Sequence, residues 1–386
     1  MKKVYLDHAA TTPLFPQVVD AMTEFLRDHY GNPSSLHSFG RDAKSYLEQA
    51  RMDVASLIGA SPDEIFFTSG GTEADNIAIL GSAALATKKH LITSAVEHHA
   101  VLDTFKYLSE QGFELSILPV DEYGMVQPQT LRQALREDTL LVSIMHANNE
   151  VGVINPIREL AQLAHEAGAL FHTDAVQSVG KIAVNVAELG VDMLTYSSHK
   201  INGPKGVGAL YRRANLELQR QVHGGGQEKK LRSGTENLPG IVGFGVAAAQ
   251  TRVIWREETK RLRDLRDMFV AEILRTIPAS QLNGHPVNRL PHNANLSFDF
   301  IEGEALLLHL DMQGIAASTG SACSSGSLSP SHVLQAMGIS ENWLASAIRF
   351  SLGHGVDEQQ IRYVLEVLQD RVEFLRKSSP YYGGDV

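Results

Sequence analysis

Residues 197–200 (Ser-Ser-His-Lys) place two hydroxyls, an imidazole and an amine directly after the apolar run 192–196. A turn rich in Gly and Pro follows at 201–206. A lysine amine beside such phosphate ligands is what an enzyme needs to bind pyridoxal phosphate (PLP) covalently. A solvated lysine at the end of a strand would give the same pattern. The rest of the chain has to separate these two interpretations.

A second segment, 64–73, has the pattern of a strand, a turn of Gly, Ser and Thr, and the start of a helix. The N-terminus of a helix presents unpaired backbone N–H groups that suit a dianionic phosphate, and the hydroxyl of Thr72 adds a donor. Ordinary helix capping is the alternative. No Gly-Lys-Ser/Thr follows and no Gly-x-Gly-x-x-Gly is present, so the segment is neither a Walker loop nor a dinucleotide fingerprint.

An acid follows another apolar run, at 172–177 (His-Thr-Asp-Ala-Val-Gln). PLP withdraws electrons only while its pyridine nitrogen is protonated, and a buried carboxylate beside that nitrogen keeps the proton in place. Asp174 is placed for this role, and Gln177 can reach the ring hydroxyl from the following turn. An aspartate that caps the next helix is the alternative.

Histidine and asparagine occupy the ends of two further strand-like runs. His98, in 95–100 (Ala-Val-Glu-His-His-Ala), can stack on a flat cofactor and move protons near neutral pH. A metal site is not expected, because adjacent histidines point in different directions and no further ligand has suitable spacing. Asn149 can bind the cofactor ring or a substrate carboxylate, with turn formation as its alternative role.

Arg349 and Cys323 are two further candidates for a binding or catalytic role. Arg349 lies inside the apolar run 347–353, where a buried guanidinium needs an anion. That anion is either the carboxylate of an amino-acid substrate or a structural ion-pair partner. Cys323, the single cysteine, lies in a Ser- and Gly-rich loop at 318–331, which is an unusual place for a packing cysteine. We therefore expect a reactive thiol on a mobile loop.

The elements that must position these residues alternate between strand and helix patterns. Such alternation predicts a mainly parallel sheet with helices on both faces, and ligands at the carboxyl ends of its strands. After about residue 240 the pattern changes to that of a smaller α+β unit. Strands are expected at 64–68, 90–94, 113–120, 139–146, 169–173, 192–196, 207–211 and 295–300, and helices at 73–86, 130–136, 157–167, 241–277, 303–312 and 357–376.

Bulk properties narrow the class of protein. The 386 residues suffice for two domains, and a net charge of −10 argues against nucleic acid or an anionic membrane as partner. One cysteine cannot form an internal disulfide, the N-terminus lacks the apolar core of a signal peptide, and no apolar run is long enough to span a bilayer. A cytoplasmic protein is expected.

Taken together, residues 5–13, 197–200, 232–235 and the loop around Cys323 resemble the cysteine desulfurases of the NifS/IscS type, within the class V aminotransferase group of PLP enzymes. The resemblance extends nearly from end to end. It implies PLP-dependent fold type I, with a large domain over 16–255 and a smaller α+β domain from 1–15 and 256–386. It also implies a homodimer with two active sites at the interface.

The resemblance implies a role for each motif residue. Lys200 would hold PLP, Asp174 and Gln177 would bind its ring, and His98 would stack on the ring as acid and base. Cys323 would take the sulfur of L-cysteine as a persulfide and leave alanine as product. The expected phosphate ligands are Gly71, Thr72, Ser197, His199 and, from the other subunit, Thr235; Asn149 and Arg349 would hold the cysteine carboxylate.

The loop resembles that of NifS and IscS, because it lacks the Arg-x-Gly-His-His-Cys pattern of the SufS-like group. The sequence ends without the extended tail with which IscS proteins dock a cluster scaffold. The sulfur acceptor is therefore expected to be an iron–sulfur scaffold or a dedicated protein such as a tRNA-thiolation enzyme. Two other functions compete: a PLP enzyme with another outcome, such as an aminotransferase or selenocysteine lyase, and a sulfur-relay protein that has lost PLP.

Overall fold

The computed structural model describes residues 3–319, 330–380 and 382. Cys323 and most of the loop expected at 318–331 therefore lie outside the described residues. Among the described residues, no helix has both the length and the apolar character needed to cross a bilayer.

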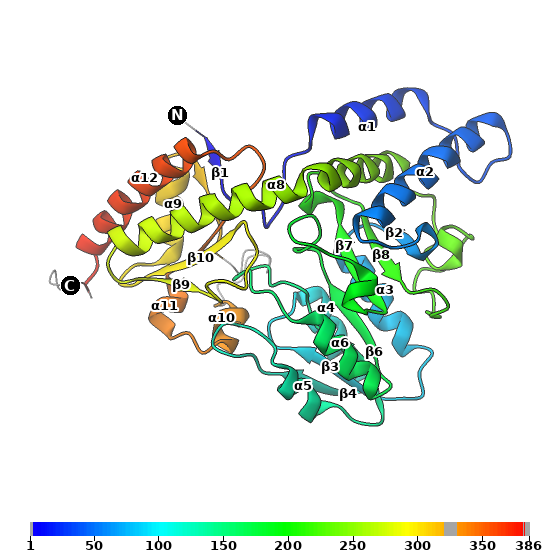
Figure 1. Ribbon diagram of the computed structural model, residues 1–386, viewed down its shortest axis with the longest axis horizontal. Coiled ribbons are helices and arrows are strands. Elements are labelled where there is room, and N and C mark those ends of the chain that lie inside the picture. The colour runs from blue at the N-terminus through cyan, green and yellow to red at the C-terminus, as the bar shows by residue number, and fades with distance from the viewer. Residues whose placement is uncertain (1–2, 320–329, 381, 383–386) are drawn as a thin grey trace.

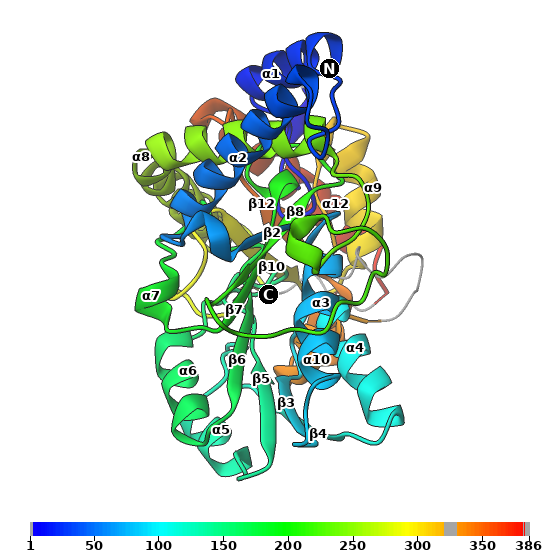
Figure 2. The same cartoon turned by 90° about the vertical axis from the view of Figure 1, so that its right-hand side faces the viewer.

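The centre of the molecule is a seven-stranded sheet with the order β2-β8-β7-β6-β5-β3-β4. Only β8 runs antiparallel to its neighbours β7 and β2. Helices α3 and α4 cover one face of the sheet, whereas α5 and α6 lie on the other (Figure 2). The predicted α/β class, with a mainly parallel sheet between helices, is confirmed. The strands are β2 (Ile65–Thr68), β3 (His90–Ser94), β4 (Glu114–Leu118), β5 (Thr139–Ser143), β6 (Leu170–Asp174), β7 (Met193–Ser197) and β8 (Gly208–Arg212).

The strands form because their side chains alternate between two apolar layers. Phe66 enters the core below α3 and α4, and the next residue, Phe67, enters the core on the other face. Met193 and Leu194 divide in the same way on β7. A strand buried on both faces needs a nearly continuous apolar run, which explains why these strands were visible in the sequence. The helices of this part are α1 (Pro16–Asp28), α2 (Ser38–Leu57), α3 (Gly71–Ala83), α4 (His99–Glu110), α5 (Pro128–Ala134), α6 (Ile157–Glu166) and α7 (Val186–Leu189).

A second group of elements has its own apolar core, with Phe269, Phe298 and Phe350 among its fully buried side chains. An antiparallel sheet of order β12-β10-β9 and a two-stranded sheet of β1 with β11 belong to this group. Its elements are β1 (Val4–Tyr5), β9 (Ser280–Asn283), β10 (Asn293–Phe298), α9 (Gly303–Asp311), β11 (Ile315–Ala316), β12 (Ala347–Ser351) and α12 (Glu358–Lys377). Helix α10 (His332–Ala336) instead buries Val333 and Leu334 in a small separate cluster with Val96 and Val151, and α11 (Glu341–Ala345) follows it.

Helix α8 (Leu238–Thr276) joins the two groups (Figure 1). Its first third packs against α1 and α2 through residues such as Phe244, while its last third enters the second core through Phe269. Six of the described helices fall outside the predicted elements: α1, α2, α4, α7, α10 and α11. Helix α2 shows the reason, because it buries small residues such as Ala43 and Ala50, which give a weak apolar periodicity.

We predict that Gly245→Ala lowers the thermal unfolding midpoint. A Cβ at Gly245 would lie 2.7 Å from the Cα and 2.8 Å from the Cβ of Ala50, where α8 crosses α2. Gly to Ala within an exposed helix would stabilise the protein by about 1 kcal/mol, but overpacking typically costs about 1–3 kcal/mol. Gly226→Ala is the control, since its nearest atom would be 3.9 Å away. Calorimetry showing a raised midpoint for Gly245→Ala would contradict the prediction.

Candidate active site

One cavity of about 240 Å³ collects most of the predicted site residues. It lies at the carboxyl ends of the parallel strands, because β6 ends at Asp174 and β7 ends at Ser197. The cavity is lined by Gly71, Thr72, His98, Asn149, Asp174, Gln177, Ser197, His199 and Lys200, together with Ala10, Asp75, Met145 and Val176.

Lys200 ends the short 3-10 helix η2 (Ser198–Lys200) and points its amine at the N-terminal segment. Its Nζ donates to the carbonyl oxygens of Ala9 at 2.6 Å and Ala10 at 2.7 Å. The Gln177 amide also donates to the Ala9 carbonyl, at 2.9 Å. The N-terminal segment thus forms one wall of the cavity and orients two of its functional side chains.

Asp174 is buried in the cavity, where its Oδ1 accepts from the backbone N–H of Val176 at 2.8 Å. This bond forms a turn, and no helix begins at Asp174, so the capping interpretation does not hold. Burial raises the pKa of the carboxyl, whereas His98 and Lys200 oppose the rise by favouring its charged form. Asp174 is therefore the natural partner for a cation placed in the cavity.

A second carboxyl, Asp75, lines the same cavity and was missed in the sequence. It is 1% exposed, and burial followed by repulsion from Asp174 raises its pKa well above the usual range. Its Oδ1 has no hydrogen-bond partner, and Nε2 of the buried His172 ring lies 3.6 Å from it. Helical spacing was the feature of the sequence that pointed to Asp75 as a site residue. Asp75 follows Thr72 by three residues and so shares the face of α3 that carries Thr72.

The N-terminus of α3 opens onto this cavity. Gly70 occupies the N-cap position and supplies no side chain to accept from the first-turn amides. These amides and the Thr72 hydroxyl are the donors expected for a phosphate. The helix end is also packed tightly against the turn that follows Asp174, because a Cβ at Gly71 would lie 2.9 Å from Val176 Cγ2.

His98 caps helix α4, with its Nδ1 accepting from the N–H of Ala100 at 3.1 Å. Burial lowers its pKa, Asp174 raises it, and Lys200 lowers it further. The net lowering favours a neutral imidazole that can accept a proton. His99 points elsewhere and lies 3.6 Å from the exposed Asp103. Within the described ranges, no group of three or more His, Cys, Asp or Glu is arranged to hold a metal ion.

The remaining predicted residues do not line the cavity. Arg349 is fully buried, donates to the Asn149 carbonyl at 2.9 Å and pairs with Asp7 at 3.0 Å, so the ion pair that was the alternative role is present. Its Nε has no hydrogen-bond partner. Thr235 is exposed. Cys323 lies outside the described residues.

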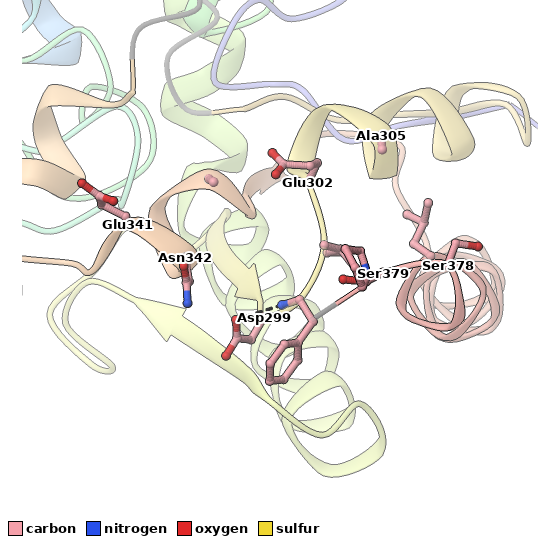
Figure 3. A pocket seen from close by; sticks show the side chains of 12 residues that line it. Asp299, Glu302, Ala305, Glu341, Asn342, Ser378 and Ser379 are labelled. Atoms are coloured by element: carbon pink, nitrogen blue, oxygen red, sulfur yellow. Dashed lines mark hydrogen bonds between the residues drawn. The ribbon is translucent and has the colours of Figure 1, made fainter. Parts of the chain in front are cut away.

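A larger cavity of about 680 Å³ lies among the second group of elements (Figure 3). It is bordered by Phe300, Glu302 and Glu341, and by residues at the end of α12. Among the residues that the structure describes, no predicted site residue and no lysine, histidine or arginine lines it. Its size alone does not make it the reactive site, and the chemistry points to the smaller cavity.

The smaller cavity fits PLP by the chemistry of its side chains. It offers an amine for the aldehyde, a buried carboxylate for the pyridine nitrogen, an imidazole for the ring, and open helix amides for the phosphate. The four groups come from separate elements, yet each has a counterpart on the cofactor.

Comparisons with known proteins agree with this chemistry. The family model for class-V aminotransferases matches residues 4–364. The cysteine desulfurase IscS of Dictyoglomus turgidum is 53% identical over 382 residues, which cover 98% of this chain and 97% of the relative. The solved structure of a NifS-like protein has a TM-score of 0.91 at 39% identity, covering 97% and 100% of the two chains. The structure of SspA in complex with cysteine has a TM-score of 0.80 at 37% identity, covering 91% and 99%.

Glu97, next to His98, generates a prediction about pH. Its carboxyl is fully buried, accepts from Ser94 Oγ at 2.6 Å and from Met145 N at 2.9 Å, and has one oxygen without a partner. Burial raises its pKa from 4.5 to about 8. The stability it contributes is therefore complete below pH 4.5 and is lost as the pH rises to about 8.

Glu97→Gln imitates the protonated carboxyl, so the variant should lose less stability than the parent protein between pH 5 and pH 8. Urea unfolding of both proteins, prepared without PLP, measures the difference across this range. Glu159→Gln, at an exposed position, is the control. Parallel pH profiles for Glu97→Gln and the parent would contradict the raised pKa.

Proposed function

The chain belongs to the class-V aminotransferase family and is a PLP-dependent cysteine desulfurase of the NifS/IscS type that takes L-cysteine as substrate, and we propose how its own residues perform the reaction. The observation that carries the proposal is the meeting of Lys200, Asp174 and His98 at the N-terminus of α3 in one cavity. The roles below rest on this arrangement.

Lys200 binds the cofactor, Asp174 pairs with its pyridine nitrogen, and Gln177 contacts its ring hydroxyl. When bound, PLP supplies an electron sink that stabilises negative charge on the carbon next to the substrate nitrogen. The Lys200 amine and the His98 imidazole both line the cavity and move the proton of this carbon. The lowered pKa of His98 suits it to accept a proton.

The phosphate is held at the N-terminus of α3. Gly71 and Thr72 supply donors from the helix, and Ser197 and His199 supply donors from the end of β7. Thr235 is exposed in the single chain, which supports a role for it in the active site of the other subunit of a homodimer.

The substrate carboxylate is held by Asn149 and Arg349. Asn149 lines the cavity, and the Arg349 guanidinium lies directly behind it with Nε unpartnered. Arg349 also has Asp7 as a structural partner, which holds the guanidinium in place and keeps its charge balanced. Arg349 therefore has two roles, one in binding the substrate carboxylate and one in stabilising the fold through Asp7.

Cys323 accepts the sulfur. Its thiolate attacks the sulfur of L-cysteine, the carbon–sulfur bond breaks, a sulfur–sulfur bond forms, and the carbon takes up a proton to give alanine. The resulting persulfide passes its outer sulfur to an acceptor, either an iron–sulfur scaffold or a tRNA-thiolation enzyme. The single cysteine of the chain is the only thiol that can serve.

Two further proposals concern the whole molecule. We assign 16–255 to a large domain and 1–15 with 256–386 to a small domain, which is supported by the separate apolar cores on either side of the middle of α8. We place the protein in the cytoplasm, with no nucleic acid or membrane as direct partner, in keeping with its acidic charge and single cysteine.

Cys323→Ala tests the proposed function. Removal of the nucleophile should lower sulfur release from L-cysteine by about 100-fold or more while PLP stays bound. Sulfide and alanine are measured together, because an aminotransferase would instead yield a keto acid and pyridoxamine phosphate. If the Cys323→Ala variant forms sulfide and alanine at the same rates as the parent protein, the proposal is wrong.

Asp174→Asn should lower kcat by about 100-fold or more, because a neutral amide cannot keep the pyridine nitrogen protonated. Visible absorbance of the purified variant checks that the cofactor is still attached through Lys200. Asp103→Asn is the matched control, since Asp103 is exposed on α4. An Asp174→Asn enzyme with parental kcat would rule out the assigned role.

A further inference from the structure

An ion pair between Glu73 and Arg232 lies beside the proposed phosphate site. Glu73 directly follows Thr72 in the first turn of α3. The Arg232 guanidinium grips its carboxylate with two nitrogens, Nε to Oε1 at 2.8 Å and Nη2 to Oε2 at 3.4 Å. The pair is largely shielded from solvent, with side chains 18% exposed for Glu73 and 25% exposed for Arg232. Water therefore screens the two charges only in part.

The Glu73 carboxylate is fixed at the N-terminal end of α3. Its Oε2 accepts from the backbone N–H of Ser69 at 2.6 Å, in the turn that leads into the helix. Burial raises the pKa of Glu73, but the hydrogen bonds from Arg232 and Ser69 outweigh burial and leave the pKa below its usual value. Glu73 is therefore an anion, held at the helix end where the phosphate is expected.

Two anions at one helix end compete for the same positive potential. A carboxylate in the first turn interacts favourably with the helix dipole, and so does a phosphate bound to the free amides of that turn. The two anions also repel each other across a partly buried space, where the effective dielectric constant is well below that of water. Among the described side chains, Arg232 is the cation that forms an ion pair with Glu73 and so offsets this repulsion.

The backbone of Arg232 is placed by contacts other than the ion pair. The preceding residue, Leu231, is buried in the apolar core that contains Phe66. Arg232 itself forms a parallel bridge with Val222. The segment is thus seated against α3 before the guanidinium is considered, so what the ion pair adds at this place is the positive charge beside Glu73.

We propose that Arg232 is a positioning residue for the cofactor phosphate, which it favours by neutralising Glu73 at the N-terminus of α3. It acts through Glu73 and does not touch the phosphate. This inference rests on the proposed placement of the phosphate beside Thr72. It also gives a role to the first residue of the segment 232–235, whose last residue, Thr235, is proposed to reach the phosphate of the other subunit.

Arg232→Met tests the proposal in the full chain, freed of cofactor and titrated with PLP. The variant leaves the Glu73 charge without its partner, so the Kd for PLP should rise by about 10-fold. Glu73→Gln removes the charge but keeps an oxygen for the Ser69 N–H. The double variant should therefore bind PLP within about threefold of the parent. Arg136→Met is the control, because Arg136 pairs with Asp138 at the opposite edge of the sheet, before β5 begins.

Pyridoxal, which lacks the phosphate, should bind Arg232→Met and the parent protein equally well. Three results would overturn the inference: parental PLP affinity in Arg232→Met, an equal loss for pyridoxal, or a double variant as weak as Arg232→Met. The last two would show a purely structural role. If Arg232→Met fails to fold, Glu73→Gln alone decides, since it keeps the positive charge of Arg232 and weaker PLP binding by it would contradict the inference.

Thr72→Val separates this inference from the proposal on which it rests. If the phosphate does not lie at the N-terminus of α3, Thr72→Val keeps the parental affinity for PLP. If only the inference about Arg232 is wrong, Thr72→Val still binds PLP more weakly than the parent. Sulfur transfer enters neither measurement, so the outcome for Cys323→Ala stays independent of both.

Discussion

Two carboxyls, Asp174 and Asp75, are buried in one small cavity, and the electrostatic cost of that arrangement shapes the site around them. Burial raises the pKa of both, and their mutual repulsion makes it unfavourable for both to ionise. Lys200 and His98 favour the charged form of Asp174, whereas the ring near Asp75 is that of the buried His172, 3.6 Å away, whose pKa burial lowers to about 3. The cavity can therefore hold one anion beside the ring nitrogen of the cofactor while the second carboxyl stays neutral.

The fold places these groups by joining two cores around one helix. Helix α8 packs into both cores, so the small group of elements is held at a defined place beside the sheet. Strand β12 of that group carries Arg349, which reaches Asn149 at the cavity. Packing of apolar side chains far from the site thus sets the distance between the groups that bind the cofactor and the group proposed to bind the substrate.

Strands could be predicted from the sequence because burial on both faces demands apolar runs, and the polar residues that end them are those that meet in the cavity. Helix α8 was visible for its length, whereas α2 was not, since small buried residues such as Ala43 and Ala50 leave little periodicity. Asp75 was missed because an acid in the first turns of a helix normally complements the helix dipole. The sequence gives no signal for the cavity wall formed by Ala9 and Ala10, because these residues bind Lys200 through their backbone carbonyls and not through their side chains. The partner of Arg349 depends on a contact between distant parts of the chain, which no local pattern encodes.

That wall links the start of the chain to its late segments. Val4 pairs with Ile315, and Asp7 forms a bridge with Ser351, so the carbonyls that face Lys200 are fixed by strands near the other end. On the ribosome, the residues of the central sheet emerge long before β11 and β12 can receive the N-terminal strand. The nascent enzyme consequently completes its cofactor cavity only after most of the chain has been made, because the wall that faces Lys200 waits for β11 and β12.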